Sequence, residues 1–100
     1  MQIDLKLILT PTMVEMLLAA VEYTSLYNKH LKDLKNKNNY NLENKLFVDT
    51  IGKIQSTNFI VHSRKLRALR LLDPDNWCLT RKGELVVELI NLTLDSARNG

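Results

Sequence analysis

The sequence predicts a mainly α-helical single domain with a small β-hairpin, a long N-terminal helix and a C-terminal helix. Apolar residues recur every three or four positions over most of the chain, which is the spacing of amphipathic helices. Residues 73–76, Asp-Pro-Asp-Asn, are typical of a tight turn between two short strands. The chain has 100 residues and no linker rich in proline, glycine or serine, so we expect residues 1–100 to form one domain.

The N-terminal segment predicts a short strand followed by a long helix. Ile3, Leu5, Leu7 and Leu9 alternate with other residues, a period of two that favours a half-buried strand over a helical start. Pro11 suits a first helical position, and Thr12 with Glu15 forms a capping-box pair. The apolar positions that extend this helix to about Lys35 are Met13, Leu17, Ala20, Val21, Tyr27, Leu31 and Leu34.

Two further helices are expected in the middle of the chain. The asparagine-rich residues 36–41 predict a loop, because asparagine side chains compete for backbone hydrogen bonds. A second, shorter helix starts at Leu42 and is weakened by Gly52. Ser56 then offers a cap for a third helix over roughly residues 57–72.

The C-terminal part predicts a brief strand and a last helix. Trp77, Cys78 and Leu79 can form a strand that leaves the turn, and Thr80 caps the helix that follows. We expect this helix to fray from Ser96. Its predicted buried side consists of Leu85, Val86, Leu89, Ile90 and Thr93.

Composition argues against membrane and disulfide-rich classes. The chain is 45% hydrophobic and 25% charged, which is close to the averages for globular proteins. No apolar run approaches the roughly 18 residues of a membrane span, so we expect no membrane association. Cys78 is the only cysteine; it cannot form an internal disulfide, which fits a reducing, cytoplasmic location.

The residue pattern offers no catalytic or metal site. None of the three glycines belongs to a phosphate-binding loop. The two histidines, His30 and His62, are not part of a closely spaced set of zinc ligands. Asp73 and Asp75 lie on a turn, where exposed acidic residues are commoner than a catalytic pair. We therefore expect no enzyme activity, no cofactor and no metal.

The sharpest functional feature is a basic segment from Lys53 to Lys82. The chain has a net charge of +3, and this segment holds seven basic residues against two acidic ones. Arginine side chains bind phosphates and guanine edges, and serine hydroxyls commonly hold the DNA backbone. A solvated charged face without a partner is the alternative interpretation. The candidate DNA contacts on the third helix are Ser56, Ser63, Arg64, Arg67 and Arg70.

The order of these elements resembles that of winged-helix proteins. In MarR-like and PadR-like regulators, and in many small phage proteins of similar build, the second wing strand ends in a Leu-Thr-x-x-Gly run, which Leu79, Thr80 and Gly83 match. Residues 63–72 look like the end of a winged-helix recognition helix, and residues 9–12 look like the usual entry to the first helix. The resemblance, over residues 9–93, implies a winged helix-turn-helix fold, double-stranded DNA as the partner, and a homodimer with terminal helices at its interface.

Some features depart from that family. The tip of the hairpin is minimal and acidic, and residues 59–61 are apolar where base-reading residues are often polar. Our leading interpretation is a winged-helix DNA-binding protein, a small transcriptional regulator. The alternative is a winged-helix adaptor or inhibitor, encoded by a phage or mobile element, that binds a protein partner through exposed apolar residues such as Ile60 or Tyr40.

Overall fold

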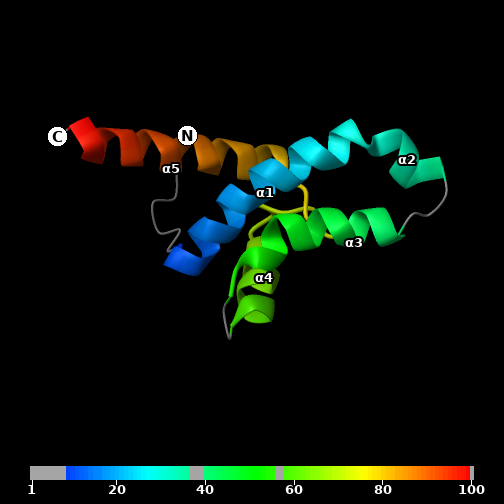
Figure 1. Cartoon of the computed structure of the whole chain (residues 1–100). Coiled ribbons are helices and arrows are strands. Elements are labelled where there is room, and N and C mark those ends of the chain that lie inside the picture. The colour runs from blue at the N-terminus through cyan, green and yellow to red at the C-terminus, as the bar shows by residue number, and fades with distance from the viewer. Residues whose placement is uncertain (1–8, 37–39, 56–57, 100) are drawn as a thin grey trace.

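The computed structural model describes residues 9–36, 40–55 and 58–99, and these are mostly helical. The molecule is elongated, 47 × 28 × 27 Å, because the C-terminal helix extends beyond the body (Figure 1). The elements within these ranges are α1 (Pro11–Lys29), α2 (Leu31–Asn36), α3 (Tyr40–Asp49), the short 3₁₀ helix η1 (Ile51–Lys53), α4 (Phe59–Ala68) and α5 (Arg81–Asn99).

The predicted β-hairpin is absent, so the winged helix-turn-helix prediction is wrong. The described residues contain no strand, and one isolated antiparallel bridge joins Leu72 to Leu79. Two backbone hydrogen bonds flank that bridge, from Asp73 N–H to the Cys78 carbonyl (2.9 Å) and from Thr80 N–H to the Leu71 carbonyl (3.1 Å). Residues 77–79 therefore touch the chain leaving α4 at one point without forming a wing. The strand predicted at residues 3–9 lies almost wholly outside the described residues.

The turn at residues 73–76 prevents further strand pairing because its side chains bind the local backbone. The Asp73 carboxylate accepts a hydrogen bond from Asp75 N–H (2.8 Å), and the Asn76 side-chain oxygen accepts one from Cys78 N–H (2.8 Å). Pro74 has no N–H to donate. Backbone donors that a longer hairpin would need are thus already used or missing.

The first helix begins as predicted at Pro11, but a different residue caps it. The Thr10 hydroxyl accepts a hydrogen bond from Met13 N–H (3.2 Å), and Pro11 occupies the first turn. Thr12 lies inside the helix, so the predicted Thr12–Glu15 capping box is wrong. A threonine preceding proline is the better cap here because its extended backbone matches what proline requires of its predecessor.

The first helix also ends earlier than predicted. It stops at Lys29 instead of continuing to about Lys35, and α2 runs on in a different direction (Figure 1). The break lies at His30, whose backbone leaves helical geometry (φ −103°, ψ 18°). His30 still donates to the Leu26 carbonyl and accepts from Leu34 N–H, both at 3.0 Å. The bend therefore costs no backbone hydrogen bond at this residue.

The end of α4 is set by a left-handed residue. Arg70 has φ 61°, and the two hydrogen bonds around it, Leu71 N–H to Leu66 carbonyl and Arg70 N–H to Arg67 carbonyl, are both 2.9 Å. This is the Schellman arrangement, which usually has glycine at the left-handed position. The helix predicted over residues 57–72 is accordingly shorter, at Phe59–Ala68.

The core forms around α1, which packs against every other helical element. The buried face of α1 includes Met16, Ala20 and Tyr23, which are fully buried. Val21, predicted to be buried, is 42% exposed. The other fully buried large side chains are Leu17, Ile51, Leu66, Leu71 and Leu72. The segments on either side of α4, which hold Ile51, Leu71 and Leu72, therefore contribute to the core together with Leu66 of the helix itself.

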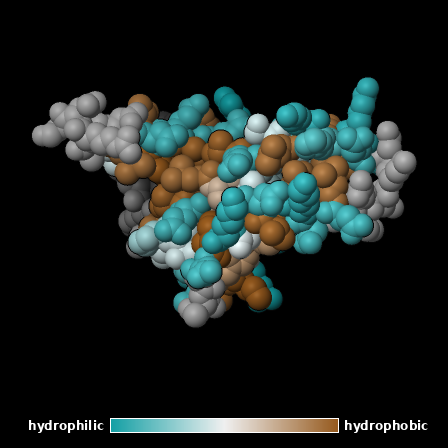
Figure 2. Space-filling view, in the orientation of Figure 1, coloured by the Kyte–Doolittle hydropathy of each residue, from teal (hydrophilic) through white to brown (hydrophobic). Residues whose placement is uncertain are grey.

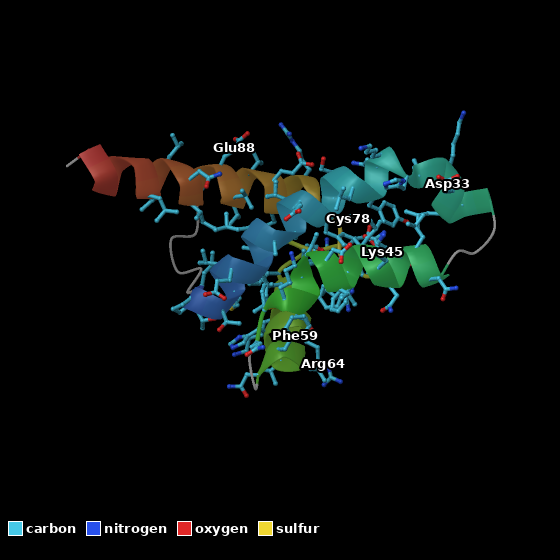
Figure 3. All side chains as sticks on the ribbon, in the orientation of Figure 1. Asp33, Lys45, Phe59, Arg64, Cys78 and Glu88 are labelled. Carbon is cyan, nitrogen blue, oxygen red and sulfur yellow. The ribbon has the colours of Figure 1, made fainter. Side chains whose placement is uncertain are left out.

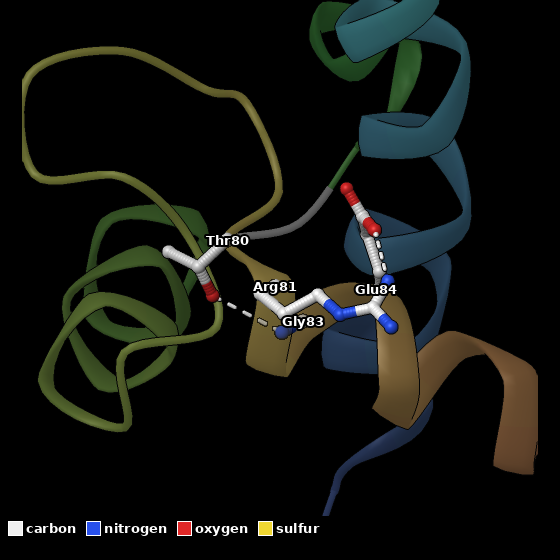
Figure 4. A network of polar contacts seen from close by, with 4 residues as sticks. All are labelled: Thr80, Arg81, Gly83 and Glu84. Carbon is white, nitrogen blue, oxygen red and sulfur yellow. Dashed lines mark hydrogen bonds and ion pairs between the residues drawn. The ribbon is translucent and has the colours of Figure 1, made fainter.

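The predicted cap of the last helix is confirmed. The Thr80 hydroxyl accepts a hydrogen bond from Gly83 N–H (3.0 Å) and donates to the Arg70 carbonyl. Arg81 pairs with Glu84 at 3.3 Å on the exposed side of the first turn (Figure 4). The helix starts at Arg81 and continues to Asn99, beyond the point where fraying was expected.

The buried side of α5 agrees with the prediction only in part, since Val86 and Ile90 are half-buried against the core. Gly83 and Val87 are buried, whereas the expected core residues Leu85 and Leu89 are 45% and 46% exposed. Gly83 sets this rotation, because a Cβ atom there would lie 2.1 Å from the Leu71 carbonyl oxygen. Only glycine lets the first turn of α5 approach the chain so closely.

Replacing Gly83 with alanine should lower the free energy of unfolding by about 2 kcal/mol or more, because the backbone must move apart. At an open helical position the same change raises the free energy of unfolding by about 1 kcal/mol. A decrease therefore indicates the close contact, and an increase indicates open space. Urea denaturation followed by circular dichroism measures the effect. Asn91→Ala, at an exposed position of α5, is the control and should change stability by less than about 0.5 kcal/mol. A Gly83→Ala protein as stable as this control would contradict the close contact.

Candidate nucleic-acid interface

The five predicted DNA contacts fall into different environments. Arg64 and Arg70 are exposed, Arg67 is half-buried and Ser63 is buried. Ser56 lies outside the described residues. The structure therefore brings Arg64 and Arg70 to the surface but does not place all of the predicted residues on one exposed face.

Ser63 serves the helix itself. Its side chain is 5% exposed, and its hydroxyl donates to the Ile60 carbonyl one turn earlier at 2.8 Å. A hydroxyl in this position has its proton committed to the backbone and little access to solvent. Ser63 thus contributes to the packing of α4 and offers no contact to a phosphate in this conformation.

Arg67 holds the loop after α4. Its Nε donates to the Asp73 carbonyl and its Nη2 to the Asn76 carbonyl, each at 3.2 Å. The guanidinium carbon lies 4.5 Å from the centre of the Trp77 ring, in a cation–π contact. We call these three contacts the Arg67 clamp. These contacts occupy much of the guanidinium. Arg67 therefore holds the turn in place and has few donors left for a ligand.

Trp77 links the clamp to an aromatic cluster that the sequence analysis did not anticipate. Its ring centre lies 5.0 Å from that of Phe47 on α3 and 5.6 Å from that of Phe59 on α4. Phe47 and Phe59 meet edge to face at 6.2 Å. The cluster brings side chains of α3, α4 and the turn after α4 into contact. In the sequence, the only sign of this cluster is the single tryptophan directly after the polar turn at residues 73–76.

One exposed stripe of α4 carries unpaired positive charge. Arg64 and Lys65 are exposed and have no ion pair among the described residues, and α4 contains no acidic residue. Val61 and Ala68 lie one turn before and one turn after them, so the four side chains share one face. Figure 3 shows Arg64 on the part of α4 that projects from the body, away from α5. Lys65 was not among the predicted contacts, although its spacing from Arg64 and Val61 could have revealed it.

The first turn of α4 is apolar and open to solvent. Ile60 is 64% exposed and Val61 is 49% exposed. Figure 2 shows brown surface beside teal where α4 projects from the body. This surface, together with Arg64 and Lys65, combines apolar and cationic contacts at one end of the molecule. Such a combination can meet thymine methyl groups and phosphates, or a protein surface.

The described residues do not assemble a metal centre. No group of three or more histidine, cysteine, aspartate or glutamate side chains lies close enough to bind a metal ion in the part of the chain that the structure describes. Burial raises the pKa of the Cys78 thiol to about 11, although a hydrogen bond with Thr24 offsets part of the rise. The thiol is therefore protonated at neutral pH and a poor nucleophile.

Within residues 9–36, 40–55 and 58–99, no helix combines the length and apolar character needed to cross a membrane. α5, with 19 residues, carries Arg81, Lys82, Glu84 and Glu88 in its first half. Charges at this density are costly in hydrocarbon.

Comparisons with known proteins leave the family open. The chain matches no protein-family model, no curated protein and no solved structure. Its function is therefore inferred from its own residues and their geometry.

Replacing Arg67 with alanine should lower the free energy of unfolding by about 2–4 kcal/mol, since two charge-assisted hydrogen bonds and a cation–π contact are lost. Arg67→Lys should recover only part of this, because one ammonium group cannot reach both carbonyls in the same geometry. Thermal and urea unfolding, followed by Trp77 fluorescence, measures both variants. Arg64→Ala is the control, with a change of less than about 0.5 kcal/mol expected. Equal stability of Arg67→Ala and Arg64→Ala would contradict the clamp.

Proposed function

We propose that this protein binds double-stranded DNA through the exposed face of α4 and acts as a small transcriptional regulator in the cytoplasm. The observation that carries the proposal is the pair of exposed, unpaired cationic side chains, Arg64 and Lys65, on a projecting helix without acidic residues. Phosphate neutralisation by such residues supplies most of the affinity of sequence-independent DNA binding.

The dimensions of α4 suit the major groove of DNA. The helix has ten residues, or about 15 Å of length, and a major groove about 12 Å wide admits an α-helix. It projects from the body (Figure 1), and Arg64 and Lys65 lie on its exposed side. In this arrangement Arg64 reaches a guanine edge, Lys65 a phosphate, and Val61 a thymine methyl group. Arg70, exposed just beyond the helix, adds a phosphate contact.

A protein-binding adaptor or inhibitor is the second candidate. Ile60, at 64% exposure, favours it, because a large apolar side chain at the tip of a projecting helix is costly to leave in water. The same surface would then contact an apolar pocket of the partner, with Arg64 at its rim. The two candidates use the same end of α4 but differ in which residues contribute most of the affinity.

The DNA-binding proposal is tested by fluorescence anisotropy of a labelled duplex over a salt series. The double variant Arg64→Ala/Lys65→Ala should weaken binding at least about tenfold and reduce the slope of log affinity against log salt by about 2. The matched control is Lys29→Ala/Lys32→Ala, which removes the same charge from exposed positions on α1 and α2. A control that weakens binding equally would show that net charge, and not α4, determines affinity.

Two further outcomes of this experiment bear on the candidates. Ile60→Ser should leave the salt slope unchanged if DNA is the partner, because serine alters no phosphate contact. Absence of wild-type binding even at low salt would overturn the DNA proposal and favour the protein partner.

We also propose that the protein is a homodimer that pairs through α5. Leu85, Leu89 and Leu92 are 45%, 46% and 64% exposed, and their spacing of four and three residues places them on one face. This set is self-complementary, because a twofold axis near Leu89 places Leu85 opposite Leu92 in an antiparallel pair. The part of α5 that extends past the body leaves room for a second copy (Figure 1).

Leu89→Glu should convert the dimer to a monomer, since two carboxylates would meet at the twofold axis. Light scattering during size-exclusion chromatography over a concentration series measures the mass. Val48→Glu is the matched control, because Val48 is 53% exposed on α3, away from α5. A wild-type protein that stays monomeric at all concentrations would contradict the dimer.

A further inference from the structure

A cleft with a volume of about 520 Å³ opens between α1, α3 and the turn that precedes α5. It lies outside the α4 surface and has no part in the proposed DNA contact. The residues that line it are Tyr23, Glu43, Asn44, Phe47, Asp75 and Trp77. They come from three separate parts of the chain, so the cleft exists only in the folded protein.

The charge of the cleft is opposite to that of the whole chain. Glu43 and Asp75 contribute two carboxylates, and none of the lining residues is basic, although the chain has a net charge of +3. Asp75 donates its backbone N–H to Asp73 in the turn, and its carboxylate accepts no hydrogen bond within the described part of the chain. The cleft therefore attracts a cation and repels an anion.

The walls of the cleft provide apolar contact. Phe47 and Trp77 line it with rings whose centres lie 5.0 Å apart at 42°. Arg67 already lies over the Trp77 ring and is not a lining residue. A cationic ligand would consequently pair with the two carboxylates, while the rings contact its methylene groups.

A buried hydroxyl without a partner faces the same place. Tyr23 is fully buried, and its hydroxyl has no hydrogen-bond partner in the described part of the chain. Burial raises the pKa of Tyr23 far above its usual value, and the Glu43 carboxylate adds to the rise. The Trp77 backbone N–H, which lies near the hydroxyl at a geometry short of a hydrogen bond, offsets part of it. Tyr23 is itself one of the residues that line the cleft, and it belongs to the inner wall because it is fully buried. Leaving a buried polar group unpaired costs about 1–3 kcal/mol, which a ligand donor would recover.

We propose that this cleft binds an alkylammonium group. The ammonium N–H groups donate to the Glu43 and Asp75 carboxylates and to the Tyr23 oxygen, and the alkyl chain lies against Phe47 and Trp77. Free polyamines and lysine side chains of a peptide share this chemistry, and the experiment distinguishes them. Neutral alcohols of the same length lack the charge and should bind far more weakly.

Trp77 makes the test site-specific because it is the only tryptophan in the chain. Its fluorescence is followed while spermidine, n-butylamine, 1-butanol or the capped peptide Gly-Lys-Gly is added at constant ionic strength and without DNA. Wild-type protein should give a saturable change with the amines and none with the alcohol. Tighter binding of spermidine than of the peptide identifies a free polyamine as the ligand, and the reverse order identifies a lysine side chain.

Glu43→Gln/Asp75→Asn should raise the Kd for spermidine at least about tenfold, because both charge partners become neutral. The matched control is Glu84→Gln/Glu88→Gln, which removes the same charge from α5. Tyr23→Phe keeps the ring and should weaken binding by about fivefold without unfolding the protein. Equal binding by the first variant and this control, or equal responses to butylamine and butanol, would overturn the proposal. Circular dichroism confirms that each variant is folded.

Discussion

The Arg67 clamp is the contact on which the other features of this structure depend. One guanidinium holds the carbonyls of Asp73 and Asn76 and lies over the ring of Trp77. Through Trp77 it fixes the aromatic cluster between α3 and α4 and one wall of the acidic cleft. Two protein carbonyls and a ring can hold an arginine because its planar fork offers several donors at fixed angles. A lysine at this position could satisfy one of these contacts but not the set.

The clamp also explains why a helix, a turn and a second helix pack closely without a β-hairpin. The left-handed Arg70 ends α4, the Asp73 and Asn76 side chains bind the local backbone, and Arg67 takes two of the carbonyls. Few backbone groups are left for strand pairing, so one bridge remains. The chain then enters α5 at once, where Gly83 allows the first turn to lie against Leu71. Local hydrogen bonding therefore outweighs the β preference of residues 77–79.

Part of this could be read from the sequence. Apolar periodicity identified the helices, and the Thr80 cap and the turn at 73–76 followed from local residue chemistry. Periodicity does not say which flank of a helix faces its neighbours, so the burial of Ser63 and the exposure of Leu85 and Leu89 were missed. The shorter α4 could not be foreseen either, because its left-handed end carries an arginine where glycine is usual. Arg67 was predicted to contact DNA, whereas its guanidinium binds the turn after α4. This role could not be foreseen, because its partners lie on a turn whose position depends on the fold.

The fold separates two charged surfaces of opposite sign. The cationic residues of α4 project to solvent, while Glu43 and Asp75 face a cleft between α1, α3 and the turn. This separation keeps the basic and the acidic side chains from neutralising one another, so each surface can attract a ligand of opposite charge. The two surfaces are joined through Trp77, which lines the cleft and holds Arg67, and Arg67 lies on α4 itself. A ligand in the cleft that shifted Trp77 would therefore act on the clamp that orients α4. Any difference in the affinity of such a ligand for two positions of that ring would appear as a change at the proposed DNA-binding surface.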